Sequence, residues 1–494
     1  MLNSRLVANP EHLQRLKAEG WNEWRAENPA LVPDLTDAQL SGLDLSGRNL
    51  MNADLARSKI EGSKLDGSSL VRAIVQGTSF KGSTMNRVDL SEVELDYQVL
   101  DNMSFVGASM KNVSCKSASI RESDMTACDL TGAKLEGTNF NQTTFAHSRL
   151  LYANFRGVYI EKCNFEGADM QQAVFDAVVY KGGNFNGANL TMAFFREAKL
   201  HGTTFRGAKL FKAIMRGAEI PGCDFSGADL SESDFERAIA VGSSFANTNC
   251  RKLFAHRADF KSCLFLGANF EEADFTGALL DKIDLRTPKL RSTNFTQARL
   301  IGANGVSANL RGCNFNEADL SGADLSEANL EGCILTKARL LGTQLRRSNL
   351  KRARLGGVSA QKADFSGTNL VGVEADEADF SEADFRFSKL IGAKLEGSSF
   401  KQCNLAHADF SEAKLGGSAF VGARGEGAKF TGHLHLKLVL AAGALMGSRN
   451  KKVEAVGDRK EVERQARIAQ LEKETKEKDR SIAGREGPKA PGGQ

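Results

Sequence analysis

A five-residue period governs most of this 494-residue chain. From Leu35 to Phe430 every fifth residue belongs to one series, and no insertion or deletion shifts it. Of its 80 members, 72 are Leu, Ile, Val, Met, Phe or Tyr, and a small side chain usually stands two places before each member. This period fits neither the 3.6-residue turn of a helix nor the two-residue alternation of a strand. The sequence therefore predicts a coil that turns a corner every five residues.

The repeating unit is clearest between Ala318 and Leu330, where the chain reads Ala-Asp-Leu-Ser-Gly-Ala-Asp-Leu-Ser-Glu-Ala-Asn-Leu. This run resembles the A-(D/N)-L-x-x unit of the pentapeptide-repeat family. The resemblance implies an all-β solenoid, a right-handed quadrilateral β-helix with twenty residues per turn and with both the large and the small residue inside. On that basis we expect about 20 coils, flanked by short α-helical extensions at the N- and C-terminal ends.

Phenylalanines recur at a spacing of twenty residues and support that turn length independently. One series contains Phe145, Phe165, Phe185, Phe205, Phe225, Phe245 and Phe265, and a second contains Phe155, Phe175 and Phe195. Equivalent rings in successive turns would lie about 4.8 Å apart, the spacing of neighbouring strands in a sheet. We therefore expect stacked aromatic columns inside the coil.

Composition changes mark the ends of the repeat region. Asn9-Pro10-Glu11 is typical of a helix start, and Trp21 and Trp24 belong to an apolar stripe that follows it. We interpret this leader as a cap over the first coil, the alternative being a partner-binding helix. The expected units are a helical cap over 1–33, the β-solenoid over 34–432, an apolar cap over 433–447, a charged helix over 448–483 and a disordered tail over 484–494.

Residues suited to catalysis or metal binding are not grouped in this sequence. All nine cysteines occupy large or small inward positions, without a C-x-x-C pair or a histidine at ligand spacing. His433 and His435 alternate on one short stretch, which is too few ligands for a closed metal site. A filled coil also offers no pocket for a substrate. We expect no enzyme activity, no metal and no cofactor.

Apolar residues interrupt a position that the repeat normally makes polar, the one before each large residue. Together with the additional aromatic Phe211, these residues are Tyr159, Val174, Val179, Phe194, Ile214, Ile239, Phe254, Leu264 and Leu279. Most fall in two columns at the twenty-residue spacing. They predict a surface for another protein or for a second copy of the chain. The alternative is that they are ordinary scattered surface residues.

Seven basic residues, without an acid between them, form a second surface feature. This basic belt comprises Lys337, Arg339, Arg346, Arg347, Lys351, Arg352 and Arg354. The positions wrap around more than one side, whereas nucleic acid requires positive charge along one face together with stacking aromatics. The belt therefore favours solvent or protein contact and argues against nucleic acid. Asn309, Asn329, Asn349 and Asn369 form a column that predicts an amide ladder.

The function that these patterns favour is a non-catalytic protein-binding scaffold, whose homodimer would form through the apolar surface or the 448–483 helix. Two alternatives come from the family: a DNA mimic that binds a topoisomerase such as gyrase, and a secreted bacterial effector. A DNA mimic needs sustained acidic columns, yet residues 1–448 hold 52 basic and 52 acidic residues. No signal peptide or membrane span is readable, so we expect a bacterial cytoplasmic protein.

Overall fold

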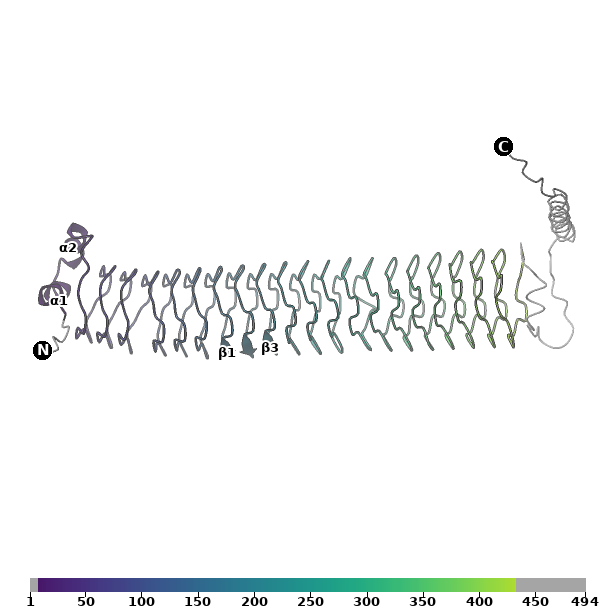
Figure 1. Ribbon diagram of the computed structural model, residues 1–494, viewed down its shortest axis with the longest axis horizontal. Helices are drawn as coiled ribbons and strands as arrows, with labels where there is room; N and C mark the ends of the chain where they lie inside the picture. The colour runs from purple at the N-terminus through teal and green to yellow at the C-terminus, as the bar shows by residue number, and fades with distance from the viewer. Residues whose placement is uncertain (1–7, 432–494) are drawn as a thin grey trace, which may run out of the picture.

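The computed structural model describes residues 8–431, which form an elongated rod of stacked turns (Figure 1). The chain enters at one end of the rod and advances along its axis without reversing direction. Regular elements are few: two helices, α1 (Pro10–Lys17) and α2 (Trp21–Glu27), and three short strands, β1 (Tyr159–Glu161), β2 (Val179–Lys181) and β3 (Lys199–His201). The rest of the described chain is held by single-residue bridges and turns.

Backbone pairing joins each residue to its equivalent twenty positions later. The strands pair in parallel in the order β1-β2-β3, with Tyr159 opposite Val179 and Val179 opposite Lys199. Isolated parallel bridges continue this register from Asp34↔Asp54 to Asp409↔Lys429. The twenty-residue turn that the phenylalanines predicted is therefore confirmed, and the fold is a parallel β-helix.

Left-handed backbone residues turn the chain at almost every fifth position, with an exception at Thr287, which precedes Pro288. They lie two places after the large residue, as at Asp37 (φ 58°) and Gly62 (φ 62°). Glycine adopts this conformation without steric cost, whereas other residues pay about 1 kcal/mol. The position also points outward, so a non-glycine residue there can carry a surface side chain. The glycine pattern of the sequence is explained by these corners.

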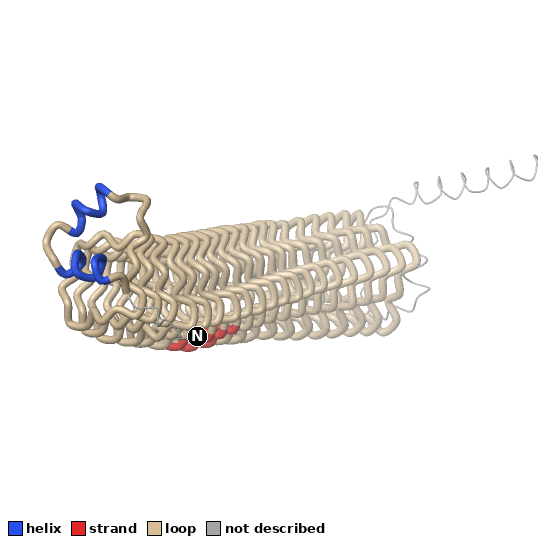
Figure 2. The backbone as a smooth tube through the Cα atoms, turned by 60° about the vertical axis from the view of Figure 1, so that its left-hand side comes forward, coloured by secondary structure: helices blue, strands red, loops and turns tan. Residues whose placement is uncertain are grey.

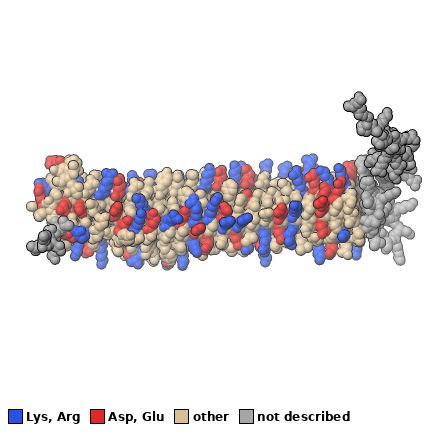
Figure 3. All heavy atoms as spheres, viewed as in Figure 1, with Lys and Arg blue, Asp and Glu red and all other residues tan. Residues whose placement is uncertain are grey.

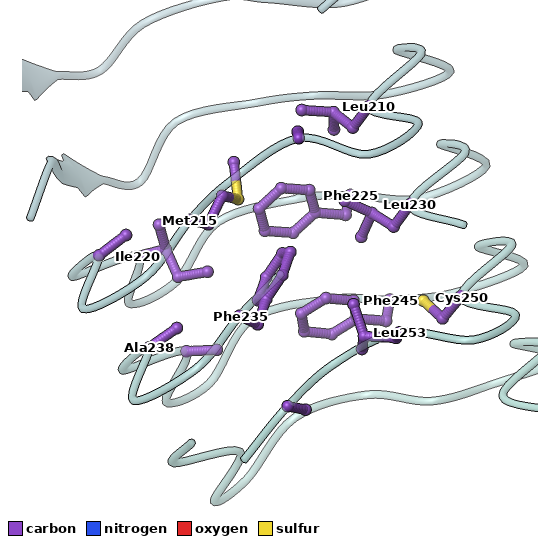
Figure 4. Close-up of a cluster of buried hydrophobic side chains, with 14 of the residues drawn as sticks. Leu210, Met215, Ile220, Phe225, Leu230, Phe235, Ala238, Phe245, Cys250 and Leu253 are labelled. Carbon is purple, nitrogen blue, oxygen red and sulfur yellow. The ribbon is translucent and has the colours of Figure 1, made fainter. Parts of the chain in front are cut away.

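The interior is filled by the large and the small residues of the repeat, both of which are almost completely buried. Figure 4 shows the packing, with Met215 and Phe235 pointing inward from successive turns and Phe225 pointing inward half a turn from each. Phe145 and Phe165 stack with ring centroids 4.8 Å apart and an interplanar angle of 4°. Phe155 and Phe175 repeat this arrangement at 4.7 Å. The expected aromatic columns are present.

The column departs from parallel stacking at its last member. Phe265 lies edge-on to Phe245, at 5.8 Å and 77°. Cys250 and Ala255 leave the turn of Phe245 short of side-chain volume, whereas the next turn carries phenylalanine at 265, 270 and 275. Close packing requires the excess volume of one turn to fill the deficit of its neighbour, and Phe265 rotates to do so. The five-residue frame alone does not predict this rotation.

Helices α1 and α2 lie against the first turns (Figure 2). Asn9 caps α1 by accepting the N–H groups of Glu11 and His12, as the Asn-Pro-Glu sequence predicted. From α2, the indole N–H of Trp21 donates to the carbonyl of Asn49 at 2.8 Å, and the Arg25 guanidinium donates to that of Met51 at 2.9 Å. These bonds satisfy carbonyls at the edge of the first turn, which no earlier turn can pair.

The units that the sequence predicted at 433–447, 448–483 and 484–494 lie outside the described residues, as do residues 1–7.

Tyr180 is an unusual interior residue that depends on a glycine opposite it. Its ring is fully buried, and its hydroxyl donates to the Cys163 carbonyl at 2.6 Å and accepts the Asn184 N–H at 3.1 Å. Gly183 holds a small-residue position, and a Cβ there would lie 1.7 Å from Cζ of the tyrosine ring. The missing side chain of Gly183 is therefore the space that the phenol occupies.

Replacing Gly183→Ala should lower the unfolding midpoint, with a free-energy cost of about 1–3 kcal/mol from overpacking. The same change in a Tyr180→Leu background should be neutral or stabilising, because leucine leaves the space empty and alanine is less flexible than glycine when unfolded. Thermal and denaturant unfolding of both single variants and the double variant measures this reversal. A glycine-to-alanine effect of the same sign and size in both backgrounds would contradict the account.

Candidate protein-binding surface

The first apolar column runs along one side of the rod at a spacing of twenty residues. Val174 bridges Phe194, Phe194 bridges Ile214, and Ile214 bridges Asp234, which in turn bridges Phe254. Each residue precedes a buried large residue, so its side chain lies on the outer surface. Phe254 is 50% exposed, and the other three apolar members are half-buried. The structure therefore brings these four residues together in one column, interrupted by Asp234.

The second column lies five residues further along each turn. Tyr159 in β1 pairs with Val179 in β2, and further along the rod Asp259 bridges both Ile239 and Leu279. Tyr159 and Ile239 are exposed, whereas Val179 and Leu279 are half-buried. This column is more mixed than the first, because Lys199 and Glu219 stand between its apolar members.

The two remaining residues of the predicted set lie apart. Leu264 is 62% exposed, but its position is ten residues, or half a turn, from that of Phe254. It therefore belongs to another side of the rod, where sequence reasoning missed its exposed neighbour Leu266. Leu266 directly follows a large residue, as Phe211 does, and not the position before a large residue where the other predicted residues lie. Phe211 is half-buried and lies one turn after Thr191, at the position that directly follows a large residue.

Cations cover part of the aromatic surface. The Arg196 guanidinium lies 4.8 Å from the ring centroid of Phe194, and the Lys212 ammonium lies 5.0 Å from that of Phe211. Next to Ile214, Arg216 forms a salt bridge with Asp234. Arginine and aromatic side chains in alternation are typical of protein interfaces, where both are enriched. The columns therefore present a mixed apolar and cationic surface.

The basic belt is largely paired with acids of adjacent turns. Arg339 lies 3.7 Å from Asp319, Arg354 lies 3.6 Å from Glu374, and Arg346 donates to Asp364. In Figure 3, basic and acidic residues alternate along the visible face of the rod. Close pairing cancels most of the long-range field of the belt. In the asparagine column, Asn349 donates to Asn329 at 3.3 Å and Asn369 donates to Asn349 at 3.2 Å, as predicted.

Aspartates before the large residue hold the corners of the coil. Asp224 accepts the N–H of Ser226 at 2.9 Å and the guanidinium of Arg206. Burial by itself raises the pKa of the Asp224 carboxyl, but the hydrogen bonds from Ser226 and Arg206 outweigh burial and hold the pKa below the ordinary value of 3.8. These carboxylates are therefore internal acceptors of the fold.

The nine cysteines are buried and unpaired, as the sequence indicated. The Cys128 thiol donates to the carbonyl of Phe105, and Cys333 donates to that of Leu310, both at 2.9 Å. Burial raises the pKa of Cys128 and of Cys333 to about 12. Thiolates are the nucleophilic form, so these thiols are inert while the coil is closed.

Within residues 8–431, no three His, Cys, Asp or Glu side chains are grouped to hold a metal ion. The helices of this part of the chain are too short and too polar to span a bilayer.

Acid should destabilise the rod through its corner carboxylates. Because the folded pKa of Asp224 is lowered, its contribution is complete above 3.8 and is lost as the pH falls through the lower folded value. Asp224→Asn retains an acceptor for Ser226 but loses the ion pair, at a cost of about 1 kcal/mol or less at neutral pH. Melting temperatures of both proteins should converge as the pH falls. A constant gap between them would contradict this role.

Native thiols should resist a thiol-specific disulfide reagent, because all nine require local unfolding to reach solvent. Colour development should be negligible in buffer and should reach nine equivalents in denaturant. Rapid reaction of even one thiol in the folded protein would show an accessible cysteine that the structure lacks.

Comparison with known proteins agrees with the five-residue frame. The family model of pentapeptide repeats matches residues 34–87, 123–176, 184–217, 221–254, 256–287, 289–402 and 403–433. Among solved structures, HetL from the cyanobacterium Nostoc sp. Strain PCC 7120, a pentapeptide repeat protein involved in heterocyst differentiation regulation, is 25% identical. That match covers 43% of this chain and 86% of HetL, with a TM-score of 0.27.

A second match is trypsin-treated QnrB1, a plasmid-mediated fluoroquinolone resistance protein, which is 19% identical. The match covers 52% of this chain and 94% of the QnrB1 chain, with a TM-score of 0.19. Rfr23, a pentapeptide repeat protein from the cyanobacterium Cyanothece 51142, is 15% identical. The match covers 32% of this chain and 90% of Rfr23, with a TM-score of 0.15. No curated protein sequence was found to match this chain. The family model covers well over half of the residues, and the chain belongs to the pentapeptide-repeat family.

Proposed function

We propose that this protein is a non-catalytic interaction rod whose two apolar columns bind another protein. The observation that carries the proposal is the outward-facing column Val174, Phe194, Ile214 and Phe254, interrupted by Asp234, at positions where the repeat normally places polar residues. The fold has no need of apolar side chains there, because Asp234 serves in the same column. Apolar surface that folding does not require is a recognised sign of an interface.

The partner should match a surface that is apolar and cationic at once. Arg196 already lies over Phe194, and burial of that pair would strengthen the cation–π attraction by removing water. Arg216 lies within ion-pair distance of both Asp234 and Glu236, yet 58% of its side chain is exposed and can contact a partner. The partner is either a second copy of the rod, in a homodimer, or a different protein with acidic groups around an apolar patch.

The form of the rod is part of this proposal. Most twenty-residue turns carry four inward residues of the five-residue series and four left-handed corners, which supports a quadrilateral coil of about 20 turns over residues 34–432; the right-handed sense is what the family resemblance implies. The bonds from Trp21 and Arg25 to the first turn support residues 1–33 as its N-terminal cap.

The carboxylates of the rod do not favour a DNA mimic of the kind that binds gyrase. A phosphate mimic requires free negative charge at regular spacing. Here Asp224 and Asp364 are bound to arginines, and each also accepts a backbone N–H. These two carboxylates are therefore not free to form part of a polyanionic surface.

The double variant Phe194→Asp with Phe254→Asp should weaken partner capture or self-association by at least about a hundredfold. The reason is that aromatic side chains buried by a partner are typical hot spots of binding energy. Asp is compatible with the fold at this position, because Asp234 occupies it and accepts the N–H of Glu236 at 3.0 Å. Light scattering measures the mass in solution, and proximity labelling in the native host measures partner capture.

The matched control is Leu341→Asp with Val421→Asp, which removes two exposed apolar residues elsewhere on the rod. The control should behave as the unmodified protein. If the 194/254 variant changes neither the mass nor the set of labelled proteins, or if both double variants lose the same partners, the columns are not the working surface.

A further inference from the structure

A separate hollow lies on one corner of the rod, in the turns after the apolar columns. It has a volume of about 590 Å³ and is formed by corner residues of four successive turns. Ser366 and Gly367 line it, with Arg346 and Arg347 one turn before and Arg386 and Phe387 one turn after. Short side chains in one turn thus stand between long side chains in its two neighbours.

Gly367 leaves an empty place in a stack of side chains. The left-handed corner position carries Arg347, Gly367, Phe387 and His407 in successive turns. Phe387 and His407 stack face to face at 5.0 Å and 11°, so planar groups at this corner align at the spacing of the turns. Arg347 and Phe387 are two turns, or about 9.6 Å, apart. That gap accommodates one planar group in contact with both neighbours.

Phe387 stacks on His407 with one face of its ring, and most of its side chain is open to solvent. Its side chain is 62% exposed, and its φ of 61° is unfavourable for a bulky residue. Among the described left-handed residues it is the one phenylalanine. The left-handed conformation is the regular corner of this fold, and Tyr97 and Tyr152 adopt it as well, so the exposed ring of Phe387 and its place beside Gly367 are what suit it to a contact.

The charge at the hollow suits one carboxylate and not a polyanion. Arg346 and Arg386 are already bound to Asp364 and Asp384. Arg347 is 79% exposed and lies 3.8 Å from Glu327, which leaves its guanidinium open to a stronger partner. A single-stranded nucleic acid would bring several phosphates close to three acids. A protein segment with an aromatic residue beside an acidic one fits better.

We propose that this hollow binds an aromatic side chain of a partner protein, which takes the empty place at Gly367. The ring would stack on Phe387 on one face and on Arg347 on the other, while a neighbouring carboxylate of the partner pairs with Arg347. This site is distinct from the apolar columns and does not depend on their function.

The test uses the full chain and the probe acetyl-Ala-(4-fluorophenylalanine)-Glu-amide, which carries one carboxylate, observed by fluorine NMR. Binding to the rod should broaden the fluorine line. Gly367→Asn fills the empty place with a side chain that tolerates positive φ, and Phe387→Asn removes the ring. Each variant should bind the probe about tenfold more weakly, because Gly367→Asn blocks access of the ring and Phe387→Asn removes its stacking partner. A version of the probe with lysine in place of glutamate should not bind.

Gly392→Asn is the control, because Gly392 is another corner glycine with φ 64°; an added Cβ there meets nothing within 4 Å, whereas at Gly367 it would lie 3.4 Å from Cγ of Arg347. It should bind the probe as the unmodified chain does. Since Gly367→Asn leaves the apolar columns intact, a loss of binding in that variant assigns the probe to the hollow. The proposal is overturned if the unmodified chain does not broaden the line, or if Gly367→Asn binds normally. It is also overturned if oligothymidylate displaces the probe more effectively than unlabelled peptide.

Discussion

The parallel backbone ladder at a twenty-residue register is the constraint on which the rest of this molecule depends. The backbone N–H of Leu35 donates to the backbone carbonyl of Asp54 at 2.7 Å. The same bond recurs along the rod, as from the N–H of Phe385 to the carbonyl of Asn404 at 2.7 Å. Each turn therefore adds about 4.8 Å and repeats the orientation of every side chain. Aromatic stacks, amide ladders and ion pairs between turns all follow from this repetition, because equivalent residues lie directly above one another.

Repetition also divides the chemistry of the rod into an interior and a surface. Hydroxyl and thiol groups at small-residue positions donate to carbonyls inside the coil, as Thr78 does to Leu55 at 2.6 Å. Aspartates at the corners accept N–H groups, as Asp364 does from Ser366 at 2.9 Å. Groups that might suggest catalysis in a globular protein are thus committed to the fold. The outward positions, which the repeat usually makes polar, are the ones that remain for contact with other molecules.

The sequence predicted the parts of the structure that the period controls. The inward series, the turn length, the glycine corners and the cap of α1 by Asn9 all follow from local rules. The rotation of Phe265 did not, because it reflects the volume of two whole turns. The separation of Leu264 from Phe254 follows from the register but requires counting half turns. The hollow at Gly367 was missed because a corner glycine looks like all the others until its neighbours are stacked above and below it.

A rigid ladder gives the two surfaces a fixed relationship. Phe254 and Phe387 are between six and seven turns apart, or roughly 30 Å along the axis. The described chain between them keeps an unbroken five-residue frame, so this separation should not vary as it would across a linker. A partner that reaches both surfaces would gain a high effective concentration at the second once it has bound the first. A partner whose contacts are spaced differently would gain nothing, so the length of the rod itself can act as a determinant of specificity.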